Sequence, residues 1–430
     1  MNFKMLHPAD RIVMIMSRIY NSGMTTTSGG NISVRDDTGT IWITPSGKDK
    51  ASLRREDIVQ ILPDGSVRGD SAPSSEYHFH LSIYMCRPDI NSVIHAHPAS
   101  LCSFSILHKA PDTSLIPDAA SICGDVAVAG YAVPGSSELG DIIADKFSKD
   151  HRSVILSNHG VVVGGSDLYE AFNILETLDY CAKLEISAKR ISSEIRKISD
   201  KHIALYRLRT SDVLEDYEPG NMCTEGLEAS REMCRLISRA NSRGLFSCTS
   251  GTFSSKLSDG SVLVTPYAVD RKYIAPADLV RVSNGKKEKG KSPSRSVVLH
   301  DMIYSCDPEI KSIIIARPPK IMAFAVTDAV FLAETMPESV FLLRHVKKYP
   351  FGSSFMQPRM LSREINSDSP VCIIENDCVI VCGKTPLQAY DRLEVLESTA
   401  SAIIEARSIG GEIHSFGRNE IELIERSMSL

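Results

Sequence analysis

The chain has 430 residues, of which 43% are hydrophobic and 23% charged, and its formal net charge at pH 7 is -5. Because domains typically span roughly 100–200 residues, this length predicts two or three domains with cores of their own. The net negative charge argues against nucleic acid or an anionic membrane surface as the main partner. Small molecules or proteins remain as partners.

Eleven cysteines are scattered along the chain without any Cys-x-x-Cys spacing. This pattern argues against a disulfide framework or a zinc ribbon, and we expect most of the thiols to be reduced and buried. Residues 1–20 lack the uninterrupted apolar core of a signal peptide, and no run reaches membrane-spanning length. We therefore expect a cytoplasmic protein with no membrane partner.

Helical and strand-like segments alternate along the first half of the chain. Apolar spacing, turn residues and a glycine after the first helix set their limits. The expected elements, in chain order, are a helix over 8–22, a small-residue loop over 25–33, a strand over 41–43, a helix over 76–86, strands over 91–97 and 153–164, and a long amphipathic helix over 166–198.

The second half repeats the first in the same order. Residues 28–45 recur as 250–266, residues 87–94 as 307–314, and residues 162–165 as 380–383. The offset drifts only from 222 to 218 residues, which chance matches would not do. The chain is therefore predicted to be a tandem duplication of one α/β domain.

The repeat sets the expected domain limits. We expect a first domain over 1–198, an exposed linker over 199–224 and a second domain over 225–430, with one short helix in the polar tail 410–430. The basic run Lys286–Lys291 is expected to be a solvated loop of the second copy.

Four residues of the first copy suggest metal chemistry. Glu76 precedes a His-x-His pair, His95 and His97, and alternate side chains of a strand point to one face. A third histidine, His159, interrupts an apolar strand, where a polar side chain costs free energy unless it has partners. Three histidines with an open position are typical of a catalytic zinc site, although ligand type alone does not choose among late divalent metals. An incidental His-x-His and a satisfied core histidine are the alternatives.

Loops of small hydroxyl and glycine residues bracket these four positions. Such loops offer backbone amides and hydroxyls that can hold phosphate without a Walker lysine, although ordinary turns are the alternative for each loop alone. The candidate phosphate-binding residues are Asn31, Ser46, Gly47, Ser74 and Ser75.

Together these motifs resemble the class II aldolase/adducin family. The likeness rests on Ser28-Gly29-Gly30-Asn31-Ile32-Ser33, Thr44-Pro45-Ser46-Gly47, Pro73-Ser74-Ser75-Glu76, His95-Ala96-His97-Pro98 and Asn158-His159-Gly160. It implies two tandem domains, each a central β-sheet flanked by helices on both faces. It also implies that His95, His97 and His159 bind Zn2+ or another divalent metal, that Glu76 is the acid/base, and that the loops bind substrate phosphate.

The function that the resemblance implies is a zinc-dependent aldolase or lyase. It would cleave a small phosphorylated sugar through a metal-stabilised enediolate, with Glu76 shuttling the proton. A sugar-acid phosphate decarboxylase or dehydratase of the same family is one alternative, and a non-catalytic adducin-like interaction protein is another. The intact glutamate and histidines favour an enzyme, and the family's epimerase branch carries aspartate at the position of Glu76.

The second copy has lost this chemistry. Alignment of the repeats places Ser296, Ile315, Arg317 and Asp377 at the positions of Glu76, His95, His97 and His159. We expect no metal there. Arg295 and Arg317 would either attract an anion or pair with Asp377, and we favour the pair because buried charges are normally paired.

The family resemblance also implies a cyclic tetramer. A tandem chain would then form a dimer that makes a pseudo-tetramer of domains, two active and two inactive. We expect substrate specificity to come from residues 117–131, with Tyr131 as a candidate and packing as its alternative.

Overall fold

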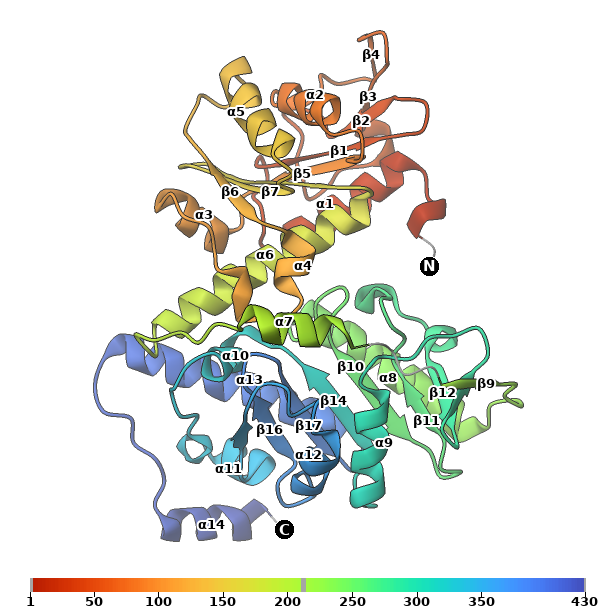
Figure 1. The fold of residues 1–430 in the computed structure, drawn as a ribbon, viewed down its shortest axis with the longest axis vertical. Coiled ribbons are helices and arrows are strands. Elements are labelled where there is room, and N and C mark those ends of the chain that lie inside the picture. Colours follow the sequence, from red (N-terminus) through yellow and green to blue (C-terminus); the bar gives the residue numbers. More distant parts are fainter. Residues whose placement is uncertain (1–2, 210–213, 429–430) are drawn as a thin grey trace. The chain divides into compact units, whose positions relative to one another are not determined.

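The computed structural model describes residues 3–209 and 214–428. It divides into two compact units: unit 1 is Met1–Thr113 with Asp118–Lys183, and unit 2 is Ser114–Pro117 with Leu184–Leu430. Each unit has one β-sheet, and helices cover both faces of that sheet (Figure 1). The expected fold class is confirmed.

Unit 1 contains an eight-stranded sheet in the order β4-β3-β2-β1-β5-β8-β7-β6. The β6–β7 pair is parallel, and the other neighbours pair antiparallel. Its elements are α1 (Pro8–Asn21), β1 (Asn31–Arg35), β2 (Ile41–Ile43), β3 (Val59–Ile61), β4 (Val67–Arg68), α2 (Tyr77–Cys86), β5 (Ser92–Ala96), α3 (Ala99–Ile106), α4 (Ala119–Cys123), β6 (Val126–Ala129), α5 (Ser137–Ser148), β7 (Ser153–Leu156), β8 (Gly160–Gly165) and α6 (Leu168–Lys189), which continues past the division between the units.

Unit 2 contains a nine-stranded sheet in the order β15-β16-β17-β14-β10-β11-β12-β13-β9. Apart from β9, this is the strand order of unit 1 with β10 to β17 in place of β1 to β8, which confirms the tandem duplication. Its elements are α7 (Asp200–Arg207), β9 (Glu215–Tyr217), α8 (Thr224–Ser242), β10 (Thr252–Lys256), β11 (Val262–Val264), β12 (Val280–Ser283), β13 (Lys286–Glu288), α9 (Val297–Cys306), β14 (Ser312–Ala316), α10 (Pro319–Ala325), α11 (Pro337–Leu343), β15 (Lys347–Tyr349), α12 (Pro358–Glu364), β16 (Val371–Ile374), β17 (Cys378–Gly383), α13 (Pro386–Ile409) and α14 (Arg418–Met428).

The core of unit 1 explains why its helices lie where they do. On one face of the sheet, Phe79 of α2 and Phe147 of α5 join a buried cluster with Val93 of β5 and Val154 of β7. Full burial of each such side chain contributes about 1.5–3 kcal/mol. Both helices are therefore fixed over the strands that carry the histidines.

Two expected elements of the first copy are corrected. The region 153–164 is a hairpin rather than one strand, because Asn158 adopts a left-handed φ of +57° between β7 and β8. The helix expected over 166–198 ends at Lys189. Residues after it are extended instead, since Ile195 pairs with Thr327 and the amide of Arg196 donates to the carbonyl of Val326 at 2.7 Å.

The region expected as linker has structure of its own. Residues 199–224 contain α7 and β9, and β9 pairs in parallel with β13. The first half of the basic run, Lys286–Glu288, is therefore a strand, and only residues 289–291 lie in a loop as expected. Acidic residues of β9 face the basic residues of β13: Glu215 lies 2.8 Å from Lys286, and Asp216 pairs with Lys287. Opposite charges on neighbouring strands explain this pairing. The short helix expected in the tail is α14.

The eleven cysteines are unpaired, as expected. Across residues 3–209 and 214–428, no helix combines the length and the apolar character that a membrane crossing requires.

A buried hydrogen-bonded triad recurs at the same place in both units. In unit 1, His80 Nδ1 lies 2.7 Å from Ser33 Oγ, which lies 2.6 Å from the hydroxyl of Tyr84. The corresponding distances in unit 2 are 2.6 Å and 2.7 Å. The triad joins the first strand of each repeat to the helix above it, and its members in unit 2 are Ser254, His300 and Tyr304.

The buried histidine of unit 2 predicts a pH-dependent stability. Burial lowers the pKa of His300 to about 3, whereas an unfolded histidine titrates near ~6.5. The unfolded chain therefore binds a proton that folded unit 2 does not, so the free energy of unfolding falls as pH drops below about 6.5. In His300→Gln, the number of protons that the chain takes up on unfolding should fall by about one. Urea midpoints, measured by circular dichroism between pH 7 and 5, should therefore depend less on pH in this variant.

The exposed His414 provides the control for this measurement. His414→Gln should keep the wild-type dependence of the midpoint on pH. A wild-type dependence in His300→Gln would contradict the assignment.

Candidate metal and active site

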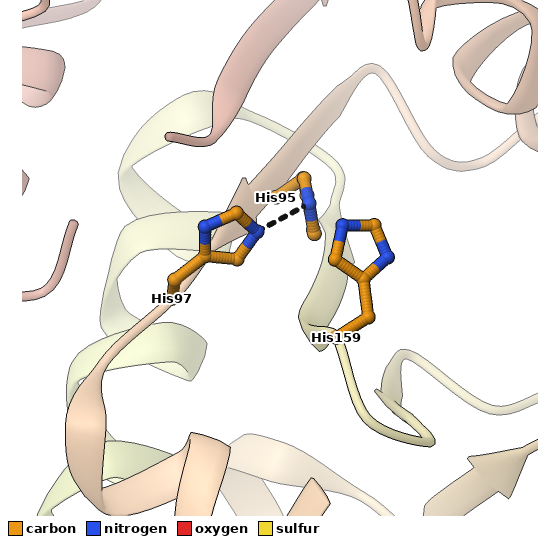
Figure 2. A group of neighbouring side chains, drawn as sticks. All are labelled: His95, His97 and His159. Carbon is orange, nitrogen blue, oxygen red and sulfur yellow. Dashed lines mark hydrogen bonds between the residues drawn. The ribbon is translucent and has the colours of Figure 1, made fainter. Parts of the chain in front are cut away.

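Three imidazole rings converge in unit 1, as Figure 2 shows. His95 lies in β5, His97 follows that strand directly, and His159 lies in the turn between β7 and β8. One ligand atom from each ring lies within 4.8 Å of the others. Because β5 and β8 are neighbours in the sheet, the fold brings together histidines that are 64 residues apart in sequence, at 95 and 159.

The hydrogen bonds and burial of these rings suit metal binding. His95 Nδ1 donates to the carbonyl of Val161 at 3.0 Å, which leaves the Nε2 lone pair facing His97 Nε2 at 2.9 Å. His159 Nδ1 is buried without a hydrogen-bond partner among the described residues. Burial, with the neighbouring imidazoles, lowers the pKa of His95 and of His97 to about 3, so both rings are neutral near pH 7. Three imidazole ligand atoms this close together fit a late divalent metal such as zinc.

Glycines make room for the rings. A Cβ on Gly160 would lie 2.5 Å from His97 Cδ2, and one on Gly29 would lie 2.8 Å from His97 Nδ1. Gly30 has a φ of +69°, and a Cβ there would lie 2.6 Å from the carbonyl of His95. The Ser-Gly-Gly and His-Gly motifs of the sequence therefore have a steric role beside the histidines.

Glu76, the residue before α2, lies against the histidines. Its Oε2 lies 3.5 Å from His95 Nε2, and its Oε1 lies 3.5 Å from His159 Nε2. Oε1 is buried and has no hydrogen-bond partner in the described part of the chain. A buried carboxylate beside two of the three imidazoles is a candidate proton-transfer group. Asn31 donates from Nδ2 to Oε2 at 2.8 Å.

The remaining candidate residues lie on two adjoining loops. The amide of Ser46 donates to the carbonyl of Ala72 at 3.0 Å, and the amide of Ser74 donates to the carbonyl of Thr44 at 3.1 Å. Ser46, Gly47 and Ser75 are exposed, whereas Ser74 is buried. Asn31 differs from these loop residues, because its side-chain amide donates to Glu76.

Three residues that the sequence did not single out support the site. His80 and Ser33 belong to the buried triad next to Asn31. Lys50 is 4% exposed, and its Nζ donates to the carbonyl of Pro45 at 2.9 Å, so a cation anchors the loop that carries Ser46. Burial lowers the pKa of Lys50. The spacing of four between Glu76 and His80 was the available signal, since it places both on one helix face. Tyr131 is 60% exposed.

In unit 2, the corresponding position holds an ion pair. Arg317 Nη2 lies 3.1 Å from Asp377 Oδ1, as the sequence favoured, and Ser354 Oγ donates to Asp377 Oδ2 at 2.6 Å. Asp377 is 2% exposed. Ile315 replaces His95 at the same register, opposite Thr252. Within residues 3–209 and 214–428, the only three-ligand histidine, cysteine or carboxylate cluster is His95, His97 and His159.

Helix α7 fills the space beside this ion pair. The hydroxyl of Tyr206 lies 3.0 Å from Arg317 Nη2, and its ring packs edge-on against Phe355 with centroids 5.5 Å apart. The guanidinium carbons of Arg295 and Arg209 lie 5.4 Å and 4.9 Å from the centroid of the same ring. An aromatic side chain with two cations near its ring therefore contacts Arg317, the residue that aligns with His97.

Comparison with known families agrees with the repeat. The family described as Class II Aldolase and Adducin N-terminal domain matches the chain twice, at residues 10–186 and 231–404.

Individual relatives match over one copy's length. The 5-deoxy-D-ribulose 1-phosphate aldolase of Bacillus thuringiensis is 33% identical over 185 residues, covering 42% of this chain and 85% of the relative. The 3-oxo-tetronate 4-phosphate decarboxylase of Haemophilus influenzae is 30% identical (45% and 92% covered), and the L-fuculose phosphate aldolase of Methanococcus maripaludis is 34% identical (40% and 92%). A solved L-fuculose 1-phosphate aldolase is 35% identical and covers 46% of this chain and 93% of its own, with a TM-score of 0.42.

The ligand geometry predicts metal binding in unit 1 alone. We expect about one divalent metal per chain, since one three-histidine group is present. His97→Ala should lose it, because two imidazoles bind far more weakly than three. The matched change in unit 2, Arg317→Ala, should retain it. Metal content is measured by mass spectrometry after dialysis. If both variants retained the same amount of metal, it would be bound elsewhere.

The packing around α7 predicts that Tyr206 stabilises unit 2. Tyr206→Ala should cost about 3–5 kcal/mol, because it leaves a cavity under two arginines. Tyr206→Phe should cost about 1–2 kcal/mol, because it removes one hydrogen bond to a charged group. Urea unfolding followed by circular dichroism measures both changes.

The sole tryptophan provides the control, because Trp42 lies in unit 1 and its fluorescence reports that unit. We expect its transition to stay at the wild-type urea concentration in both Tyr206 variants. If the circular-dichroism transition of Tyr206→Ala kept the wild-type urea midpoint, the packing role would be contradicted.

Proposed function

The chain belongs to the class II aldolase and adducin family, and we propose that unit 1 is a divalent-metal-dependent lyase that cleaves a carbon–carbon bond of a phosphorylated sugar. The observation that carries this proposal is that Glu76 lies 3.5 Å from two of the three clustered histidines. The names of the relatives supply the substrate class, because aldolases and decarboxylases of sugar phosphates are among them.

The residues have distinct roles in this proposal. His95, His97 and His159 hold the metal, for which we propose Zn2+, and the bound cation would supply Lewis-acid stabilisation of negative charge on substrate oxygen. Glu76 removes a proton from a substrate hydroxyl and returns it to carbon after the bond breaks. Its distance of 3.5 Å from two of the histidines keeps the proton acceptor beside the reacting oxygen.

The two adjoining loops are the proposed phosphate site. Ser46, Ser74 and Ser75 offer hydroxyls, and Gly47 and Ser75 offer amides, without bulk. The amides of Ser46 and Ser74 form the backbone bonds that hold the two loops together. The buried charge of Lys50 below the loop adds a favourable potential for an anion.

A sugar-acid phosphate decarboxylase is the second candidate. It is favoured by the 3-oxo-tetronate 4-phosphate decarboxylases of Haemophilus influenzae and Pectobacterium atrosepticum, which are 30% and 32% identical. Both reactions leave negative charge on an oxygen next to the broken bond, so the same metal and carboxylate serve either one. The two are separated by product, since cleavage releases an aldehyde and decarboxylation releases carbon dioxide.

Unit 2 is proposed to serve assembly rather than catalysis. In unit 2, an ion pair that contacts Tyr206 stands in place of candidate metal ligands, while the strand order is kept. We propose a homodimer in the cytoplasm in which two active and two inactive units form a pseudo-tetramer. A non-catalytic role for the whole chain would leave Glu76 and the three histidines without a purpose.

The proposal predicts the effect of neutralising Glu76. Glu76→Gln keeps the shape of the side chain but cannot accept the proton, so kcat should fall by about 10²–10⁴-fold. The assay is a panel of L-fuculose 1-phosphate, 5-deoxy-D-ribulose 1-phosphate and 3-oxo-tetronate 4-phosphate, with detection of dihydroxyacetone phosphate and carbon dioxide. Ser296→Ala, at the matching position of unit 2, should keep wild-type activity. A metal-loaded wild type that turns over no member of the panel would count against both candidates.

A further inference from the structure

Unit 2 has a cavity of about 320 Å³ where α11, α13 and β17 lie together (Figure 1). Gly383, the last residue of β17, lines this cavity, whereas Asp377 of the ion pair precedes the first residue of the strand. The length of β17 therefore separates the cavity from the positions of the lost metal ligands. The charged residues that line the cavity are three cations and two carboxylates: Arg344, Lys384, Arg392, Glu309 and Asp368.

Arg392 of α13 is the buried cation of this cavity. It is 8% exposed, and its guanidinium donates from Nε to the carbonyl of Leu342 at 2.9 Å and from Nη1 to the carbonyl of Cys382. Within the part of the chain that the structure describes, Nη2 has no hydrogen-bond partner and no carboxylate pairs with the charge. Burial lowers the pKa of Arg392. Because a buried charge without a counter-ion costs free energy, an anion beside Nη2 would stabilise unit 2.

A guanidinium on the matching carbonyl recurs in unit 1, where it has a counter-ion. Ile122 and Leu342 are the penultimate residues of α4 and α11. The carbonyl of Ile122 accepts from Arg152 Nη2 at 3.2 Å, and Arg152 Nη1 donates to Glu170 Oε1 at 2.6 Å. The two repeats therefore share a guanidinium at this place, although it comes from the residue before β7 in unit 1 and from α13 in unit 2.

Unit 2 has an amide in place of this carboxylate. Gln388 stands at the position of Glu170, and it also lines the cavity. Gln388 Oε1 accepts from the amide of Lys384 at 2.8 Å, as Glu170 Oε2 accepts from the amide of Ser166 at 2.8 Å. The second polar atom of Gln388 is Nε2, which donates and cannot accept from a guanidinium. Unit 2 thus keeps the bond to the backbone and loses the negative charge.

Two cations of the cavity replace residues without charge. Arg392 stands at the position of Ile174, which is fully buried in unit 1, and Arg344 stands at the position of Gly124. Arg344 keeps the left-handed backbone of that glycine, with a φ of +53° against +65°. A residue other than glycine is strained there, and such strain is found mostly at functional sites. The common fold of the repeats does not require these cations.

The two carboxylates of the cavity are engaged at the surface. Asp368 lies 2.8 Å from Arg344 Nη1, and Glu309 lies 2.9 Å from Lys384 Nζ. All four side chains are exposed, and exposed ion pairs contribute little free energy. Neither carboxylate pairs with the buried guanidinium, so a bound anion would meet an uncompensated charge.

We propose that this cavity binds a small oxyanion, the carboxylate or phosphate group of a metabolite, against Arg392. The anion supplies in unit 2 the negative charge that Glu170 supplies in unit 1, and Arg392 Nη2 and Gln388 Nε2 are its donors. The exposed cations of the cavity add a favourable potential for it. A volume near the lower end of the range of roughly 300–1,000 Å³ for ligand pockets restricts the ligand to a small molecule.

The rival role for Arg392 is structural alone. Its bonds to the carbonyls of Leu342 and Cys382 tie α13 to α11 and β17. If these two bonds were enough to balance the buried charge, a carboxylate placed beside it would change neither anion binding nor stability. The two roles are therefore separated by a variant that adds such a carboxylate.

The first test is a calorimetric titration of the full chain with two probes, inorganic phosphate and succinate. Gln388→Glu installs the carboxylate of unit 1 four residues before Arg392, where the two side chains meet on one helix face. The new carboxylate should take the place of the anion, so this variant should bind one equivalent of probe fewer than the wild type. Any phosphate bound in unit 1 is common to both chains and cancels in the difference.

The exposed Gln357, which does not line the cavity, provides the matched control. Gln357→Glu adds the same charge to unit 2 and should keep wild-type binding of the probes. A loss seen with succinate alone or with phosphate alone identifies the oxyanion as a carboxylate or a phosphate. Equal binding of both probes by the wild type and Gln388→Glu would overturn the proposal.

The second test needs no ligand. Because Gln388→Glu gives Arg392 a counter-ion, it should raise the urea midpoint of unfolding, measured by circular dichroism without added anion. The transition of Trp42 fluorescence, which reports unit 1, should stay at the wild-type urea concentration.

Arg392→Ile provides the background that isolates this effect, since it removes the charge and carries the residue of unit 1 at this position. In that background, Gln388→Glu should not raise the midpoint. No gain in the wild-type background, or an equal gain in both backgrounds, would show that Arg392 does not lack a counter-ion and would overturn the proposal. Neither test depends on catalysis by unit 1.

Discussion

The antiparallel pairing of β5 with β1 and β8 is the constraint on which the site depends. It sets His95 opposite Asn31 on one side and opposite Val162 on the other. The ring of His95 is fixed through its bond to the carbonyl of Val161. A slip of one residue in either pair would turn these side chains to the other face of the sheet. The burial of β5 over its whole length makes such a slip costly.

The same pairing without the chemistry is present in unit 2. There β10 and β14 keep the register, with Thr252 opposite Ile315. The buried triad also remains, so the repeat retains what holds its sheet and helix together. Arg317 and Asp377, which align with His97 and His159, form a packed ionic and aromatic cluster with Tyr206. This cluster is compatible with a stable unit 2, because its buried charged groups are hydrogen-bonded to one another.

Much of this architecture could be predicted from the sequence. The duplication, the alternation of helices and strands and the four chemical positions follow from local motifs and their order, and the fold and family are confirmed. The roles of the individual site residues stay predictions. Periodicity could not reveal that Tyr206 contacts Arg317 in unit 2, since these residues lie far apart in sequence. The hairpin at His159 was missed although Asn158 and Gly160 are turn residues, because the apolar run on both sides resembled one strand.

The contacts of Asn31 show where motif reasoning ends. A small polar residue after two glycines is typical of a phosphate loop, and only the three-dimensional contacts place its amide on Glu76. The contacts from Glu76 through Asn31, His80 and Ser33 to Tyr84 join residues of β1, α2 and the loop before α2. Sequence spacing links Glu76, His80 and Tyr84 on one helix face, but it does not reach Asn31 or Ser33.

We propose that the chain holds one metal site, in unit 1. The most direct test is an anomalous difference map of crystals of the full chain, with data collected on both sides of the zinc absorption edge. We expect one peak per chain, within bonding distance of His95, His97 and His159, and none beside Arg317 and Asp377. A peak in unit 2, or none in unit 1 with zinc supplied, would contradict it.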